Sequence, residues 1–131
     1  MSIAKKIILD TNFLMIPGLF GIDIVSEIDK VCDFSYELCV FDKTIDELNC
    51  VLKTATGKDK LAANIAKKLL ETKRFRIIET VCDESYVDDI LVKYGKDHIV
   101  ATNDIKLMNR LKEKNIPILR LRQKKLIVLE K

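Results

Sequence analysis

Short apolar runs alternate along this 131-residue chain with longer segments in which apolar residues recur every three or four positions. Short runs are typical of β-strands, and the longer spacing is typical of helices that bury one face. The predicted strands are Lys6 to Asp10, Glu37 to Phe41, Arg76 to Glu79, His98 to Thr102 and Ile118 to Leu121.

Helical periodicity fills the intervals between these strands. Residues 22 to 32, 43 to 53 and 59 to 73 carry apolar side chains at helical spacing, and shorter stripes run from Val87 to Tyr94 and from Ile105 to Leu111. Strand and helix therefore alternate. This order predicts a three-layer α/β/α sandwich with a mainly parallel sheet of about five strands.

The end of the chain carries one more apolar run, Leu126 to Leu129. We expect it to form a hairpin with the fifth strand. The alternative is an edge strand that pairs with a second copy of the chain in a homodimer. No repeat or linker divides the sequence. We therefore expect one domain over residues 1–131, with residues 122–131 as a basic and apolar C-terminal strand or tail.

Composition excludes several classes of protein. A hydrophobic share of 48% beside 33% charged residues argues against disorder. No apolar run approaches the ~18 residues that span a bilayer. The first apolar stretch, Ile7 to Leu9, is too short for the core of a signal peptide. We therefore expect a cytoplasmic protein with no membrane partner. The four cysteines lack the paired spacing of a zinc site.

The net charge of +3 hides an uneven distribution. Residues 1–104 carry 14 basic and 18 acidic side chains, whereas residues 105–131 carry nine basic and two acidic ones. A basic end on an acidic body indicates either a surface that binds polyanions or a solvated lysine-rich end.

Four acids fall where predicted strands lead into helices: Asp10, Glu47, Asp88 and Asp104. In an open α/β sheet, ligands bind beyond the carboxyl ends of the strands, so these acids are the candidates for chemistry. Helical projection favours Asp88 and Glu47 over their neighbours Asp89 and Asp46, because the favoured residues border the apolar stripes. Asp89 instead points to solvent, where we expect it to form an ion pair with Lys93 four residues later.

Carboxylates that converge in one cleft repel each other unless a cation lies between them. Oxygen ligands without histidine or cysteine select hard ions such as Mg²⁺ or Mn²⁺, which often take part in phosphoryl chemistry. The neighbouring polar residues Thr11, Asn12, Thr102 and Asn103 are candidates to orient the carboxylates or bound waters. Each acid also has a purely structural explanation, as a helix cap or as a partner of a helix dipole.

These residues resemble the motifs of the PIN-domain nucleases. The resemblance is carried by Asp10-Thr11-Asn12-Phe13-Leu14, by Glu47 within Asp-Glu-Leu, by Tyr86-Val87-Asp88-Asp89-Ile90 and by Ala101-Thr102-Asn103-Asp104. It extends from Ile7 to about Leu121. The resemblance implies that Asp10, Glu47, Asp88 and Asp104 are the metal-binding catalytic set of a Mg²⁺- or Mn²⁺-dependent ribonuclease. Asn12 and Thr102 match positions that support such a set.

Two branches of this family remain open. The phrases Asp-Thr-Asn-Phe-Leu and Val-Ala-Thr-Asn-Asp are closer to the branch that cleaves precursor ribosomal RNA, which implies a ribosome-assembly partner. The chain length is that of a VapC-type toxin, which implies an antitoxin partner.

Two other functions compete with the nuclease. A haloacid-dehalogenase-like, Mg²⁺-dependent phosphatase also carries an aspartate after its first strand, but this sequence matches that family only at Asp10 and Asn12. A non-catalytic RNA-binding or ribosome-assembly module would instead use the basic end. The candidate phosphate contacts are Lys106, Arg110, Arg120, Arg122, Lys124 and Lys125.

Overall fold

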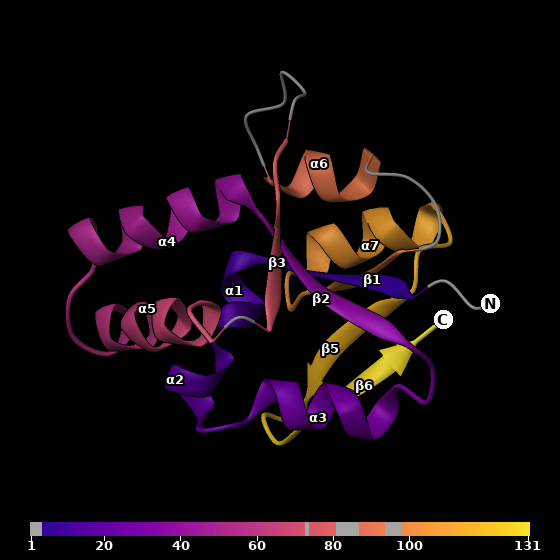
Figure 1. Ribbon diagram of the computed structural model, residues 1–131, viewed down its shortest axis with the longest axis horizontal. Helices are drawn as coiled ribbons and strands as arrows, with labels where there is room; N and C mark the ends of the chain where they lie inside the picture. Colours follow the sequence, from indigo (N-terminus) through magenta and orange to yellow (C-terminus); the bar gives the residue numbers. More distant parts are fainter. Residues whose placement is uncertain (1–3, 73, 81–86, 94–97) are drawn as a thin grey trace.

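The computed structural model describes residues 4–72, 74–80, 87–93 and 98–131, and of Val87, Asp88 and Lys93 it describes the backbone alone. Figure 1 shows one sheet between two layers of helices. The strands are β1 (Lys5–Leu9), β2 (Tyr36–Phe41), β3 (Phe75–Ile78), β4 (His98–Ala101), β5 (Ile118–Arg122) and β6 (Leu126–Glu130). The helices are α1 (Thr11–Leu14), α2 (Ile16–Phe20), α3 (Ile24–Val31), α4 (Asp42–Thr54), α5 (Gly57–Leu70), α6 (Val87–Lys93) and α7 (Ile105–Glu113).

The strand order is β3-β2-β1-β4-β5-β6, and every neighbouring pair is parallel except β5 and β6. The chain builds β2 and β3 on one side of β1 and then returns to place β4 on the other side. The carboxyl ends of β1 and β4 therefore lie side by side where the chain changes direction, with Leu9 opposite Ala101. In sheets of this kind, such a point leaves a crevice for ligands.

Alternating residues of each strand serve the two layers of helices, because successive side chains point to opposite faces of a sheet. Ile7 and Leu9 of β1 pack into the core formed with α1 to α5. Ile8, between them, packs into the smaller core under α6 and α7. All three side chains are fully buried. The predicted three-layer α/β/α fold is confirmed.

The sixth strand forms the hairpin expected from the sequence. β6 pairs antiparallel with β5, with Arg122 opposite Leu126. Gln123 and Lys124 take positive φ angles of 54° and 55°, and Lys125 N–H donates to the carbonyl of Arg122 at 3.0 Å. Two consecutive residues with positive φ give the turn the twist that a tight hairpin requires.

Two short helices, α1 and α2, were not predicted. Phe13, Leu14, Met15 and Ile16 are all buried, so this stretch shows no one-sided helical stripe. Helix α2 packs on α5 so closely that a Cβ atom on Gly18 would lie 2.4 Å from Ala62 Cα. Gly18 therefore permits the contact between the two helix backbones.

In the part of the chain that the structure describes, no helix combines the length and apolar character needed to cross a membrane.

Candidate active site

Asp10 lies at the carboxyl end of β1 and is 4% exposed. Its backbone N–H donates to the carbonyl of Ala101 at 3.0 Å, which joins it to the end of β4. Its Oδ1 accepts from Phe13 N–H at 2.9 Å and so caps α1, while Oδ2 accepts from Thr102 Oγ1 at 2.5 Å. Hydrogen bonds to both oxygens offset much of the cost of burying this carboxylate.

Thr102 links two of the candidate acids through one hydroxyl group. The hydroxyl donates to Asp10 Oδ2 and accepts from Asp104 N–H at 3.1 Å. Thr102 is fully buried, and its own N–H donates to Leu119 O of β5 at 3.0 Å. The positions of Asp10 and Asp104 are therefore coupled through a side chain that cannot move freely.

Asp104 begins α7 as its N-cap. Its Oδ1 accepts from Lys106 N–H at 2.9 Å and from Leu107 N–H at 3.2 Å. Its Oδ2 accepts no hydrogen bond from a described residue. The predicted capping role is thus real, but it occupies one oxygen and leaves the other available to a ligand.

Glu47 approaches from the other side, on α4. It is exposed, and its Oε1 accepts a hydrogen bond from the hydroxyl of Thr11. Its Oε2 accepts no hydrogen bond from a described residue. A threonine thus lies beside a carboxylate on each side of the site: Thr102 with Asp10, and Thr11 with Glu47.

Asp10, Glu47 and Asp104 line one cavity of about 420 Å³, which we call the acidic cavity. Its remaining lining residues are Thr11, Asn12, Cys50, Val51 and Thr54. The structure therefore brings together three of the four acids predicted from the sequence. The fourth, Asp88, lies in α6, but its side chain is outside the described part of the structure.

The donor set of the acidic cavity suits a hard divalent cation. Three carboxylates meet there, and its lining includes no lysine or arginine. Like charges in a partly enclosed space favour a bound cation, and oxygen ligands favour Mg²⁺ or Mn²⁺. Among the described residues, no three acidic, histidine or cysteine side chains are already close enough to hold one ion. The carboxylates thus face a shared space without forming a closed ligand shell.

A second cavity of about 490 Å³, which we call the side pocket, adjoins the acidic cavity. The two cavities share Asn12, Val51, Thr54 and Asp104, so they form one continuous groove. The other residues that line the side pocket are Met15, Leu19, Phe20, Ala55, Asp59 and Asn103.

Asn12 and Asn103, the other residues predicted to orient the carboxylates, differ in their contacts. Asn103 Oδ1 accepts from Leu121 N–H at 3.0 Å and so anchors the loop after β4 to β5. Asn12 is exposed and lines both cavities. Sequence reasoning missed Cys50 and Thr54. They follow Glu47 on α4 by one and two helical turns, so the helical projection that selected Glu47 also places them on its side.

Asp42 shows how an acid at the same sheet edge differs from those in the cavity. It follows β2, and its Oδ1 accepts from Thr80 Oγ1 and from Lys43 N–H, both at 2.8 Å. Partial burial raises the pKa of Asp42, but these hydrogen bonds outweigh it and hold the pKa below its usual range. Asp42 lines neither the acidic cavity nor the side pocket. Its carboxylate instead connects the end of β2 to Thr80, which follows β3.

The candidate RNA-binding residues are not equally free. Arg110 donates to Asp89 of α6 at 2.8 Å, and Arg120 donates to Glu130 across the β5–β6 hairpin at 2.5 Å. Asp89 thus meets Arg110, whereas its predicted partner Lys93 has a side chain outside the described structure. Lys124 lies over the ring of Phe20. The exposed side chains of Lys106, Arg122 and Lys125 pair with no described residue.

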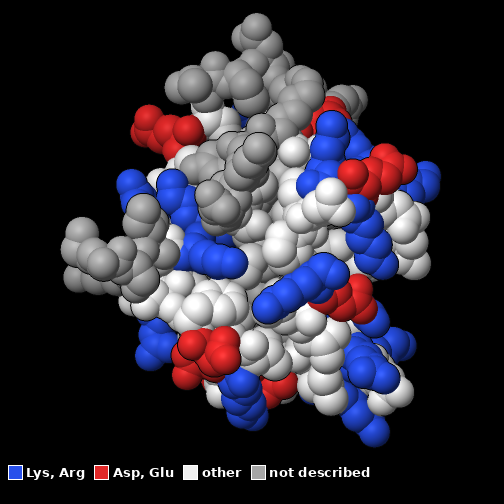
Figure 2. All heavy atoms as spheres, turned by 90° about the vertical axis from the view of Figure 1, so that its right-hand side faces the viewer, with Lys and Arg blue, Asp and Glu red and all other residues white. Residues whose placement is uncertain are grey.

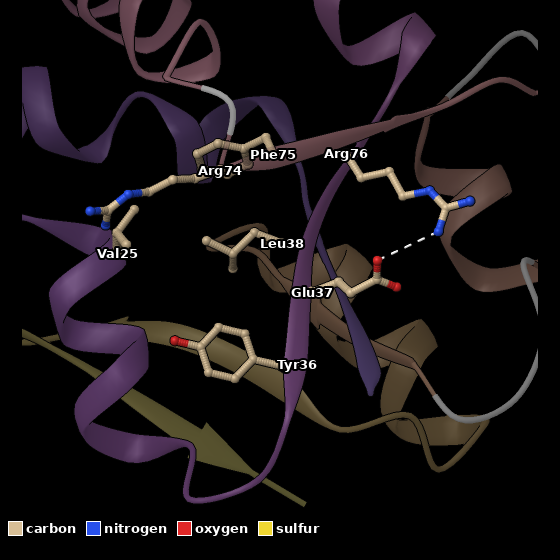
Figure 3. A pocket seen from close by; sticks show the side chains of 7 residues that line it. All are labelled: Val25, Tyr36, Glu37, Leu38, Arg74, Phe75 and Arg76. Atoms are coloured by element: carbon tan, nitrogen blue, oxygen red, sulfur yellow. Dashed lines mark hydrogen bonds and ion pairs between the residues drawn. The ribbon is translucent and has the colours of Figure 1, made fainter. Parts of the chain in front are cut away.

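A hollow of about 540 Å³ lies at the amino ends of β2 and β3, beside α3. We call it the amino-edge hollow. Figure 3 shows Arg76 and Glu37 pointing toward each other, at 3.5 Å, while Arg74 extends the other way toward Val25. Tyr36 Oη donates to Asp29 at 2.8 Å. Figure 2 views the molecule from the right-hand side of Figure 1, where acidic groups lie among the lysines and arginines. At the hollow, Glu37 pairs with Arg76, whereas Arg74 forms no ion pair with a described residue.

A model of the PIN like domain family matches residues 7–124 of the chain. The chain belongs to this family. Ribonuclease VapC4 of Methanocaldococcus jannaschii is 35% identical over 125 residues, which are 92% of this chain and 92% of that protein. Ribonuclease VapC9 of Archaeoglobus fulgidus is 31% identical over 126 residues, which are 94% of this chain and 87% of that protein.

The fold is also shared with a solved structure, that of the PIN domain endonuclease Utp24. The two superpose with a TM-score of 0.76 at 27% identity, over 95% of this chain and 90% of that chain. The family predicted from the four sequence phrases is therefore confirmed, and with it the PIN fold. This result favours a nuclease over the phosphatase alternative.

Proposed function

We propose that this PIN-domain protein is a metal-dependent endoribonuclease that hydrolyses RNA phosphodiester bonds in the acidic cavity. The observation that carries the proposal is that Asp10, Glu47 and Asp104 line one cavity, and that no lysine or arginine lines it with them. Family membership and the ribonuclease names of two relatives support it. Asp88, which follows in the same family pattern, is proposed as the fourth acid.

The carboxylates have distinct proposed tasks. Asp10, fixed by Phe13 and Thr102, provides a rigid anchor for Mg²⁺ or Mn²⁺. Asp104 and Glu47 each keep one oxygen without a described hydrogen bond, and these oxygens are available to the ion or to its water ligands. When bound, such an ion polarises the scissile phosphate and lowers the pKa of a bound water. Thr102 and Thr11 hold the carboxylates in place.

The biological role proposed first is toxin-like RNA cleavage with an antitoxin partner, because two relatives carry VapC names. Processing of precursor ribosomal RNA is the second role, supported by the phrases at Asp10 and Asp104. Sequencing the ends of cellular RNA cut by the wild-type protein, but not by Asp10→Asn, separates the two. Ends confined to precursor ribosomal RNA would favour processing.

The test of the activity uses purified protein, single-stranded RNA and either Mn²⁺ or Mg²⁺. We expect cleavage by the wild type, and a loss of at least about 100-fold in Asp10→Asn and in Asp104→Asn, as for removal of one electrostatic stabiliser. Asparagine keeps the oxygen that caps α1 or α7, so both variants should still fold. Asp46→Asn, an exposed acid beside Glu47 that lines neither cavity, is the matched control and should remain active.

Cleavage that persists in EDTA would contradict the metal requirement. Full activity in both Asp10→Asn and Asp104→Asn would contradict the site. Tight, salt-sensitive RNA binding without any metal-dependent turnover would instead support the binding-module alternative.

A further inference from the structure

The side pocket differs in character from the acidic cavity that it adjoins. Its walls include the apolar side chains of Met15 and Leu19 from the α1–α2 region and of Val51 from α4. Phe20, the last residue of α2, is 38% exposed and also lines the pocket. Apolar walls with a partly exposed aromatic ring suit a flat, weakly polar group rather than an ion.

Polar groups lie at defined points around these apolar walls. Asp59, in the first turn of α5, is exposed, and its carboxylate accepts no hydrogen bond from a described residue. Asn103 uses its Oδ1 to accept from Leu121, which leaves its amide nitrogen as a donor without a described partner. Among its polar groups the pocket thus offers an acceptor at Asp59 and a donor at Asn103, a combination that recognises the edge of a nucleobase.

Charge distinguishes a base from a phosphate as the occupant. The lining contains two acids, Asp59 and Asp104, and no lysine or arginine, so a phosphate group inside would be repelled. A cation lies beside one wall of the pocket: Lys124 Nζ is 6.0 Å from the centroid of the Phe20 ring. This arrangement places a positive charge beside the pocket, where the backbone of a bound strand would pass.

We propose that the side pocket binds a nucleobase of the RNA substrate next to the phosphodiester bond cleaved in the acidic cavity, with Phe20 as the stacking residue. The proposal rests on the ribonuclease function proposed above and adds a specificity site to it. Asp59 accepts a hydrogen bond from an exocyclic amino group, so adenine, cytosine or guanine is preferred over uracil.

The test measures binding of fluorescent oligoribonucleotides to Asp10→Asn, in which cleavage is blocked, by anisotropy. Replacing one nucleotide at a time by an abasic residue should reveal a position at which the Kd rises about 5- to 100-fold, the range found for base–aromatic stacking. In Asp10→Asn/Phe20→Leu, the intact oligonucleotide should bind more weakly by a similar factor. The further loss at the abasic position should then be much smaller, because both changes remove the stacking contact and only the contact with Asp59 remains to be lost.

Phe34→Leu in the same background is the matched control. Phe34 also lies under a lysine, with Lys5 Nζ 5.4 Å from its ring centroid, but it lines neither the side pocket nor the acidic cavity. This control should leave both the Kd and the abasic penalty unchanged. Asp59→Asn tests the base edge separately and should reduce the preference for an amino-bearing base over uracil without removing the abasic penalty.

Two results would overturn the proposal: equal affinity for intact and abasic oligonucleotides at every position, or a full abasic penalty that persists in Phe20→Leu. Neither depends on turnover. A wild-type protein that cleaves RNA with Mn²⁺ but shows either result would retain its nuclease function and lose only the base pocket. A protein that shows the Phe20-dependent penalty but never cleaves would lose the nuclease function and keep the pocket.

Discussion

The two ends of the parallel strands carry hollows of similar size that differ in charge. The amino-edge hollow has a volume of about 540 Å³, and the acidic cavity at the carboxyl ends about 420 Å³. At the amino edge, Glu37 meets Arg76 and Asp29 meets Tyr36. At the carboxyl edge, the lining of the acidic cavity contains three carboxylates and no basic side chain. The gathering of negative charge without basic side chains, rather than the volume, distinguishes the candidate site.

The direction of the helices explains this difference. At the carboxyl edge, α1, α4 and α7 begin directly after β1, β2 and β4, so their N-termini and unpaired N–H groups lie there. Asp10 caps α1, and Asp104 caps α7. Among the described elements, these helix N-termini do not lie at the amino edge of the strands. The acids there interact with arginine or tyrosine instead.

The sharpest way to break this comparison is to remove one glutamate at each edge. Glu47→Gln should lower the rate of metal-dependent RNA cleavage about 100- to 1000-fold, because it removes charge from the acidic cavity. Glu37→Gln changes the same chemical group at the amino-edge hollow and should leave the rate within about twofold, since solvent-exposed ion pairs contribute little. Initial rates with Mn²⁺ measure both. Equal losses in the two variants would contradict the assignment.

A smaller effect is expected when one hydroxyl is removed at each edge. Thr102→Val deletes the donor to buried Asp10 and the acceptor of Asp104 N–H, and should lower the free energy of unfolding by about 1–3 kcal/mol. It should also reduce cleavage about 10- to 100-fold, as for the loss of a group that orients metal ligands. Urea denaturation and initial rates measure the two effects.

The control is Tyr36→Phe, which deletes the hydroxyl that donates to exposed Asp29. It should change the free energy of unfolding by less than about 1 kcal/mol and leave cleavage unchanged. A Thr102→Val variant as active as the wild type would show that the bond to Asp10 has no part in the site.

The smallest effect concerns alkaline pH at the amino edge. Desolvation, followed by the hydrogen bond to Asp29, raises the pKa of Tyr36 from 10.0 to about 12. The folded state therefore holds this proton more tightly than the unfolded chain. The resulting stabilisation is complete below pH 10 and is lost as the pH rises toward 12. A component of the tyrosinate absorbance should titrate near pH 12, and Tyr36→Phe should remove that component. An unchanged titration would contradict the expected shift.

Much of the site could be predicted because β-strands place their ends predictably. Parallel pairing of β1 and β4 brings Asp10 and Asp104 to one edge of the sheet. Helical projection selected Glu47 at the border of the apolar stripe of its helix, and Glu47 lines the same cavity. The resemblance of four short sequence motifs to the PIN-domain nucleases added the expectation that the four acids form one set. Helical projection favoured Asp88 over Asp89; in the structure Asp89 pairs with Arg110 and is not among the residues that line the acidic cavity. The position of the Asp88 side chain stays a prediction.

Other features were beyond the reach of sequence patterns. Four consecutive residues across α1 and the start of α2, Phe13 to Ile16, are buried, so this stretch lacks the one-sided stripe by which helices are recognised. The side pocket, which α1 and α2 help to form with α4 and α5, could not be foreseen either. Thr102 was a candidate to orient the carboxylates, but that one hydroxyl serves both Asp10 and Asp104 depends on side-chain geometry between residues 92 positions apart. Spacing along the chain carries no information about such a contact.

The strand order also determines when the proposed site comes into existence during synthesis. A growing chain presents Asp10 and Glu47 early, but β4 pairs with β1 only after residues 98–101 have been made. Asp10 lacks the hydroxyl of Thr102 until then, and the acidic cavity lacks Asp104. Closing so long a loop is among the slower steps of folding. A chain that stops before β4 lacks both the Thr102 hydroxyl and Asp104, so the proposed site assembles only after residues up to Asp104 have been made.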